Sequence, residues 1–167
     1  MKKLLMIGLA VTLMSVPAPA AYVTAESGLC VREKPDENSE RVRVLPIGTE
    51  MDGEITDGWM QIEDGYISTD YIGDEDPLEL IGTWRVTAYA YTGSACANGE
   101  MPETGRTIAH NSLPFGTLIY IDGVGVREVM DRGPAYLGTE WCDLYLGNVT
   151  ECVNWGDQTR KVWRVKE

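Results

Sequence analysis

The chain has 167 residues, of which 44% are apolar and 24% are charged, and it carries a net charge of −12. This composition is typical of a globular protein, and the length allows one or two small domains. Nucleic acids and anionic membrane surfaces are bound through basic patches, so this acidity excludes both as electrostatic partners. The sequence favours a neutral partner that is bound through shape and aromatic contacts.

The first twenty residues have the plan of a secretory signal peptide. Lys2 and Lys3 precede an apolar run from Leu4 to Val16, and Ala18-Pro-Ala20 forms a small-residue cleavage pattern. The apolar run is short for a membrane-spanning helix. We therefore expect cleavage near Ala20, secretion, and no membrane attachment after cleavage. The alternative is an anchor that is retained.

Residues 21–73 contain short runs of β-forming residues separated by turn residues. The runs are Tyr22–Thr24, Leu29–Arg32, Arg41–Leu45, Glu50–Ile55, Trp59–Ile62 and Gly65–Ser68. Many short strands at close spacing predict a small all-β barrel, and no helical periodicity of useful length is present. The acidic stretch that follows contains Gly73 and Pro77, and it predicts a linker over residues 74–82.

Residues 83–167 predict a second barrel of about six strands. The strand candidates are Trp84–Tyr91, Thr117–Ile121, Val126–Met130, Asp143–Leu146 and Lys161–Val165. Asn148 to Trp155 predicts one short helix, which begins at an asparagine cap and ends at Gly156. Residues 92–106 are rich in Gly, Pro and Asn and predict a long functional loop. The predicted fold class is all-β.

The chain has four cysteines, which are Cys30, Cys96, Cys142 and Cys152. After secretion they would be in an oxidising compartment, where disulfide bonds form. Three of them belong to the second domain, so we expect at least one disulfide bond there, joining Cys96 to Cys142 or to Cys152. Metal binding is the competing interpretation, but the spacings lack the close cysteine pairs of structural zinc sites. We therefore predict neither a metal nor a cofactor.

Three titratable residues of the second domain lie at the ends of apolar runs, each beside a Gly or Pro turn. They are His110, which is the only histidine of the chain, Asp131 and Asp143. A rigid β scaffold presents titratable groups to a cleft at such positions. The structural alternatives are a core histidine, an aspartate in a turn, and an aspartate at a strand start bonded to backbone N–H groups.

The first domain resembles the bacterial SH3 domain, SH3b. The resemblance rests on Gly28-Leu-Cys-Val-Arg-Glu-Lys-Pro35, Leu45-Pro-Ile-Gly-Thr49, Asp57-Gly-Trp59 and Gly65-Tyr-Ile-Ser-Thr-Asp-Tyr-Ile72. It covers nearly the whole domain, although such families usually have Asn where Cys30 stands. The resemblance implies a small SH3-like barrel over residues 21–73 that targets the protein to the cell wall and has no catalytic role.

The second domain resembles the six-stranded double-psi β-barrels of cell-wall proteins over Trp84 to Val165. Ala109-His-Asn-Ser-Leu-Pro-Phe-Gly-Thr117 with Asp131-Arg-Gly-Pro134 is similar to the rare lipoprotein A group of septal lytic transglycosylases. Cys142-Asp-Leu-Tyr-Leu146 with Val153-Asn-Trp-Gly156 is similar to the three-aspartate (3D) domain of stationary-phase survival proteins and MltA-type lytic transglycosylases. The 3D family has a further Asp where this chain has His110-Asn111, so two of its three aspartates are present.

This second resemblance implies a secreted lytic transglycosylase that cleaves the MurNAc–GlcNAc bonds of peptidoglycan by carboxylate acid/base chemistry. The catalytic candidates are Asp143, Asp131, Glu100 and His110, where His110 would orient Asp131 or share a proton with it. Arg132 would hold a carboxylate as a bidentate partner. Sugar rings would stack on Tyr89, Tyr136 and Trp141.

The alternative is a non-catalytic, expansin-like protein that binds or loosens the glycan. In both cases the expected partner is a peptidoglycan glycan strand, and the protein is expected to be a monomer.

Overall fold

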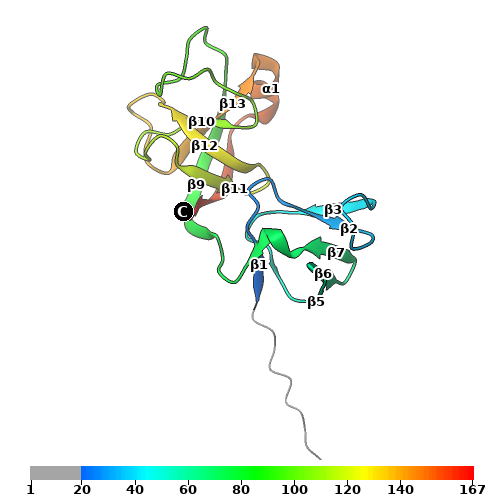
Figure 1. Cartoon of the computed structure of the whole chain (residues 1–167). Coiled ribbons are helices and arrows are strands. Elements are labelled where there is room, and N and C mark those ends of the chain that lie inside the picture. Colours follow the sequence, from blue (N-terminus) through cyan, green and yellow to red (C-terminus); the bar gives the residue numbers. More distant parts are fainter. Residues whose placement is uncertain (1–19) are drawn as a thin grey trace, which may run out of the picture.

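The computed structural model describes residues 20–167, and the expected signal peptide, apart from Ala20, lies outside the described residues. The described chain is all-β apart from one short α-helix and one turn of 3-10 helix, as the sequence predicts. Its strands form two lobes, a smaller N-terminal lobe and a closed barrel (Figure 1). Between Ala20 and Glu167, no helix has the length and apolar character that crossing a membrane requires.

The N-terminal lobe consists of two small antiparallel sheets around one apolar core. Its elements are β1 Ala21–Val23, β2 Leu29–Arg32, β3 Arg41–Leu45, β4 Glu50–Met51, β5 Glu54–Thr56, β6 Trp59–Ile62, β7 Gly65–Ser68, the 3-10 helix Thr69–Tyr71 and β8 Ile72–Gly73. One sheet has the order β3-β2-β7-β6-β5 and the other the order β4-β1-β8. Alternation along β2 directs Leu29 and Val31 into a core that Val23, Met60 and Ile67 complete.

The second lobe is a ring of six strands. Its elements are β9 Leu78–Ala90, β10 Thr107–Ala109, β11 Leu118–Ile121, β12 Gly125–Asp131, β13 Trp141–Gly147, α1 Val149–Trp155 and β14 Gln158–Val165. The strand order is β10-β12-β11-β14-β9-β13, and β13 pairs back with β10 to close the ring. Two pairs are parallel, β10 with β12 and β13 with β9, and the others are antiparallel.

Several boundaries differ from the sequence expectation. Strand β9 begins at Leu78, so the last five residues of the predicted 74–82 linker belong to a barrel strand. Strand β10 was not predicted. Helix α1 is confirmed with both of its ends: Asn148 Oδ1 accepts a hydrogen bond of 3.0 Å from the Glu151 N–H, and Gly156 ends the helix at a φ of 68°.

Strand register gives the barrel wall two distinct faces. Val86, Ile108, Val129, Cys142 and Leu144 point inward and form much of the core. On the other face of the wall, the register places Thr87 opposite Asp143, Asp143 opposite Ala109, and Ala109 opposite Asp131. Four adjacent strands therefore carry a row of polar and small side chains on the outer face of the barrel.

Candidate active site

The two predicted aspartates lie on either side of one small residue. Ala109 of β10 pairs with Asp143 of β13 on one side and with Asp131 of β12 on the other. The register of β10 against β12 shifts between Ile108 and Ala109, so Asp131 rather than Met130 faces Ala109. The side chain between the two carboxylates is therefore a single methyl group.

Asp143 has an environment that favours its protonated form more than the environment of an ordinary aspartate does. Burial raises its pKa above the ordinary value, and the negative charge of Asp131 raises it further. One opposing effect is the Thr87 hydroxyl, which donates a hydrogen bond of 2.8 Å to Asp143 Oδ1 and lowers the pKa. Among residues 20–167 this bond occupies Oδ1 and leaves Oδ2 without a protein donor.

Asp131 has the environment of a fixed carboxylate. Its Oδ1 accepts hydrogen bonds from the backbone N–H groups of Ala97 at 2.9 Å and Arg132 at 2.8 Å. Its Oδ2 accepts a third bond, at 3.1 Å, from the Tyr89 hydroxyl. Donors from a strand, a loop and its own chain neighbour hold this side chain in one orientation. The two aspartates therefore have unlike environments.

Tyr89 lies on the same face as the aspartates, as expected for a site residue. Its hydroxyl contacts the Asp131 carboxylate, whereas the expected role was stacking on a sugar ring. Burial and the charge of Asp131 raise the pKa of the Tyr89 hydroxyl, so this group is a hydrogen-bond donor at neutral pH. Its ring packs edge-on against Tyr145 at a centroid distance of 5.4 Å. Cys96, which is 5% exposed, lies beside it, and burial raises the pKa of its thiol.

The structure separates His110 from the carboxylates. His110 follows Ala109 directly, so its ring points to the opposite face, where it stacks on Trp84 at 4.8 Å. Nδ1 accepts the N–H groups of Ser112 and Leu113 at 3.2 and 3.0 Å, and Nε2 therefore donates to the Thr139 carbonyl at 3.0 Å. Burial lowers the pKa of this ring. His110 is a neutral structural residue, and the predicted proton sharing with Asp131 does not occur.

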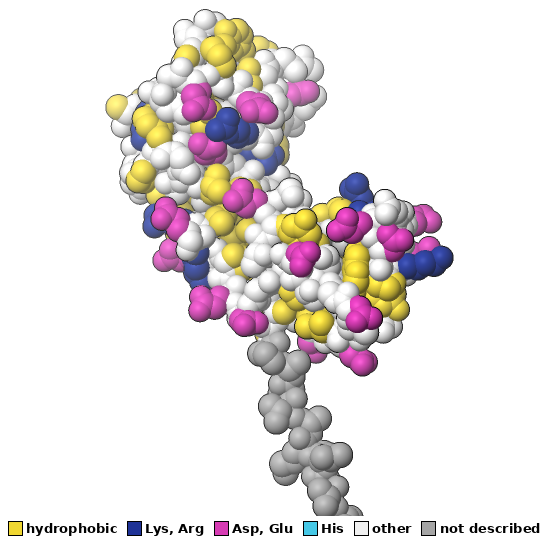
Figure 2. Space-filling model, viewed as in Figure 1, with side chains coloured by type: hydrophobic (Ala, Val, Ile, Leu, Met, Phe, Trp, Pro, Cys, Tyr) yellow, Lys and Arg dark blue, Asp and Glu magenta, His cyan; other side chains and the backbone are white. Residues whose placement is uncertain are grey.

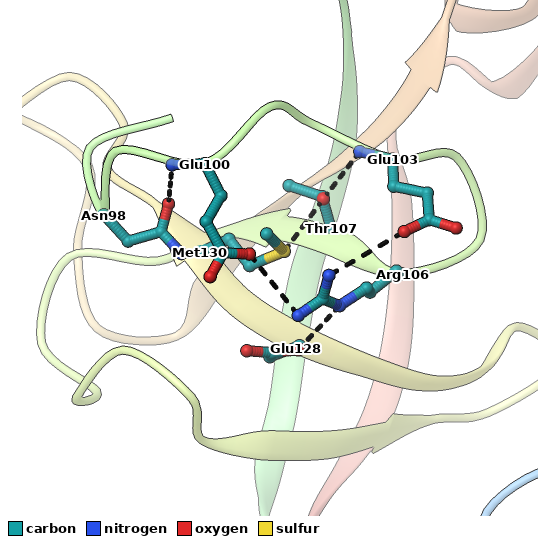
Figure 3. Close-up of polar contacts among 7 residues, drawn as sticks. All are labelled: Asn98, Glu100, Glu103, Arg106, Thr107, Glu128 and Met130. Carbon is teal, nitrogen blue, oxygen red and sulfur yellow. Dashed lines mark hydrogen bonds and ion pairs between the residues drawn. The ribbon is translucent and has the colours of Figure 1, made fainter. Parts of the chain in front are cut away.

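Glu100 also lies apart from the aspartate pair. Its side chain is 58% exposed and forms an ion pair of 3.5 Å with Arg106 (Figure 3). The same guanidinium contacts Glu103 and Glu128, so these four residues form a charged cluster, which we call the Arg106 cluster. Glu100 contributes to the anchoring of the loop and does not point to Asp131 or Asp143.

Two of the three remaining predicted binding residues, Arg132 and Trp141, have structural contacts. Arg132 does not pair with a carboxylate: Nη1 donates to the His110 carbonyl at 2.7 Å, and the guanidinium stacks on Phe115 at 3.7 Å. Trp141 is 4% exposed, and its indole N–H donates to the Thr87 hydroxyl at 2.9 Å. Tyr136 is 85% exposed and remains available to a ligand.

The expected disulfide bond is not formed. Cys96, Cys142 and Cys152 are all free thiols, as is Cys30. Cys142 points into the barrel core, where burial raises the pKa of its thiol to about 12, so it faces away from the loop that carries Cys96. Among residues 20–167 no group of three or more His, Cys, Asp or Glu side chains is arranged to hold a metal ion.

Three residues of the site were not predicted from the sequence. Thr87 bonds Asp143, Ala97 supplies a backbone donor to Asp131, and Ala109 separates the two carboxylates. Thr87 could have been found, because alternation from Tyr89 places it on the same face of the strand. The other two act through backbone or through small size, which leaves no signal in a single sequence.

No protein-family model matches this chain, and a search of the curated proteins found no match either.

Proposed function

We propose that this protein is a secreted peptidoglycan-active enzyme, a lytic transglycosylase that cleaves MurNAc–GlcNAc bonds with Asp143 as the acid. The observation that carries the proposal is the pair Asp131 and Asp143 across Ala109, in which burial raises the pKa of Asp143 and three donors fix Asp131. Two carboxyl groups with unlike environments are what glycosidic cleavage requires.

The geometry supports a mechanism in which one carboxyl group acts first as the general acid and then as the general base. Protonated Asp143 gives its proton to the glycosidic oxygen as the C1–O bond breaks. The negative charge of Asp131 stabilises the oxocarbenium-like transition state. A hydroxyl of the same sugar then attacks C1 and returns its proton to Asp143, which yields an anhydro sugar and restores the acid.

The N-terminal lobe supports a role in wall targeting of the SH3b kind. A hollow of about 440 Å³ on this lobe is lined by aromatic and polar side chains, among them Arg32, Trp59 and Tyr71. Aromatic faces with nearby hydrogen-bonding groups suit an uncharged or weakly charged polymer. We assign the barrel to the double-psi, 3D-like class on the sequence motifs and on its closed six-stranded ring.

One observation favours the second candidate, a non-catalytic wall-binding or wall-loosening protein. Asp131 already accepts three hydrogen bonds, and neither Glu100 nor His110 joins it. Asp143 is then the single carboxyl group free to transfer a proton. A glycan that lies along this face would be recognised without being cleaved.

Incubation with purified peptidoglycan separates the two candidates when the released sugars are analysed by mass spectrometry. We expect anhydro-muropeptides from the wild type, and a loss of roughly 10²–10⁴ in rate for Asp143→Asn, which keeps the shape of the side chain. Asp131→Asn is expected to be comparably damaging. Asp157→Asn, an exposed aspartate of the same barrel, is the matched control and should remain active.

Wild-type activity in both site variants would remove the aspartates from the mechanism. No release by the wild type, together with intact sedimentation on peptidoglycan, would support the binding protein instead.

A further inference from the structure

The loop between β9 and β10 supplies one of the donors that hold Asp131. Within this loop, residues 91–106, the Ala97 N–H bonds Asp131 Oδ1 at 2.9 Å and the Asn98 N–H bonds the Met130 carbonyl at 3.1 Å. Cys96 beside them is buried against Tyr89. The position of this short segment therefore decides whether Asp131 keeps its backbone donor.

The Arg106 cluster fastens the other end of the same loop to strand β12. Arg106 Nε donates to Glu128 Oε2 of β12 at 2.8 Å, and the two Nη atoms lie 3.5 Å from Glu100 and 3.8 Å from Glu103 of the loop (Figure 3). The backbone repeats the link, because the Glu128 N–H donates to the Arg106 carbonyl at 2.8 Å. Glu128 stands three residues before Asp131.

Next to this cluster, Thr107 connects loop and strand a second time. Its hydroxyl accepts the Glu103 N–H at 2.9 Å and contacts the Met130 sulfur at 3.1 Å, as Figure 3 shows. Met130 in turn accepts the Asn98 N–H through its carbonyl. The contacts run without a break from the Arg106 cluster to the segment that donates to Asp131.

One cation serves three carboxylates in this cluster, which makes it unlike a single exposed ion pair. Isolated surface pairs contribute little, because solvent screens both charges. Without Arg106, however, Glu100, Glu103 and Glu128 would face one another uncompensated, and the side chain of Glu128 is only 21% exposed. Their repulsion would be relieved by movement of the loop away from β12.

We propose that Arg106 is a positioning residue that holds the 91–106 loop against β12 and so keeps the Ala97 N–H on Asp131. The importance of this contact for catalysis rests on the proposed function, whereas the effect of Arg106 on the position of the loop does not. Arg106 touches neither Asp131 nor Asp143, and it acts only through the loop.

A displaced loop would take the Ala97 donor away from Asp131 and admit water beside the aspartate pair. The pKa of Asp143 is raised by burial and by the charge of Asp131, so hydration of the pair would move it down toward the ordinary value. The titratable groups near the aspartate pair come from the surrounding elements. Tyr89 of β9 and Cys96 of the loop lie beside Asp131, whereas Cys142 of β13 and Cys152 of α1 lie beside Asp143.

The test is a ¹³C NMR titration of the aspartate carboxyl carbons in the full chain, alongside the pH profile of sugar release. For Arg106→Gln we expect the titration midpoint of Asp143 to move to lower pH, together with the alkaline limb of the pH profile of sugar release. We expect kcat/KM at pH 7 to fall on the order of ten- to a hundredfold. Arg106→Gln combined with Glu128→Gln should reverse part of this shift, because it removes one of the three uncompensated carboxylates. Arg43→Gln is the matched control, since Arg43 also has an ion pair and similar exposure, 47% against 44%.

An Asp143 midpoint in Arg106→Gln equal to that of the wild type overturns the proposal, even if the enzyme is active. If Arg106→Gln does not fold, Arg106→Lys keeps the charge but not the three-way contact. It should show a smaller shift in the same direction, and no shift again overturns the proposal. A wild type without activity overturns the proposed function only, because the titration still measures the positional effect.

Discussion

At the residue scale, the site contains two aspartates whose surroundings differ. Asp143 is partly buried and has one side-chain donor, whereas Asp131 has three donors and lies nearer the loop. The charge on Asp131 is itself one of the causes of the raised pKa of Asp143. A change at Asp131 is therefore expected to alter the titration of Asp143, and the two residues should be analysed as a coupled pair.

The raised pKa of Asp143 predicts a cost in stability at neutral pH. The folded chain holds this proton more tightly than the unfolded chain, so the resulting stabilisation is full below the unfolded pKa of about 3.9 and is lost as the pH rises through the folded pKa. Asp143→Asn carries no such loss. We expect this variant to gain stability relative to wild type between pH 4 and pH 7, as measured by urea unfolding at both pH values.

Asp157→Asn is the control, and it should change the stability in the opposite direction. Arg85 holds the pKa of Asp157 below its ordinary range, so the wild-type carboxylate is stabilising at pH 7 and its removal should reduce stability slightly. If Asp143→Asn instead lost stability relative to wild type over this pH range, the assignment of a raised pKa to Asp143 would be wrong.

At the element scale, the loop after β12 is packed directly on the strand that carries Asp143. A Cβ atom at Gly133 would collide with the ring of Trp141, and the indole of Trp141 donates to Thr87, which in turn donates to Asp143. Close packing therefore connects the loop to Asp143 through two hydrogen bonds.

This contact predicts that Gly133→Ala displaces Trp141. Overpacking of this kind costs about 1–3 kcal/mol, and loss of the Trp141 bond would also change the donor strength of Thr87. The control is Gly138→Ala in the same loop, because a Cβ there has nothing within 4 Å. Urea unfolding followed by tryptophan fluorescence measures both variants, and equal stability of the two would contradict the packing argument.

Elements with a local signal were predictable from the sequence, and those defined by tertiary contacts were not. Helix α1 was predicted with its ends because Asn148 and Gly156 act locally. Strand β10 was missed because Thr107–Ala109 is short and buried on both faces, so it lacks the alternation that indicates a half-buried strand. His110 was placed in the site because a single sequence does not tell which face of β10 points to the core.

At the scale of the whole molecule, the two lobes differ in charge as well as in fold. Residues 20–77 contain fifteen acidic and four basic residues, whereas residues 78–167 contain eleven acidic and eight basic ones. Acidic side chains are spread over the visible face of the N-terminal lobe in Figure 2. This lobe would repel a polyanion at long range.

The lobes meet around the start of β9, and Glu26 of the N-terminal lobe also lines two hollows together with barrel residues. Lys166 donates its backbone N–H to the Pro77 carbonyl and its ammonium to the Asp76 carbonyl, both at 2.8 Å. Leu78, the first residue of β9, packs closely on Gly48 of the N-terminal lobe. The two apolar cores share no residue, since one is formed within 21–72 and the other within 81–162.

Two separate cores predict two units that unfold independently. Ile67→Ala in the N-terminal lobe and Ile119→Ala in the barrel each remove a fully buried side chain, at a cost of about 2–5 kcal/mol. We expect each variant to lose hydrogen-exchange protection in its own lobe and to keep wild-type protection in the other, because the junction transmits little of the packing energy. Equal loss of protection across both lobes in either variant would mean that the junction makes the chain a single cooperative unit, and the two lobes would then have to be treated as one domain.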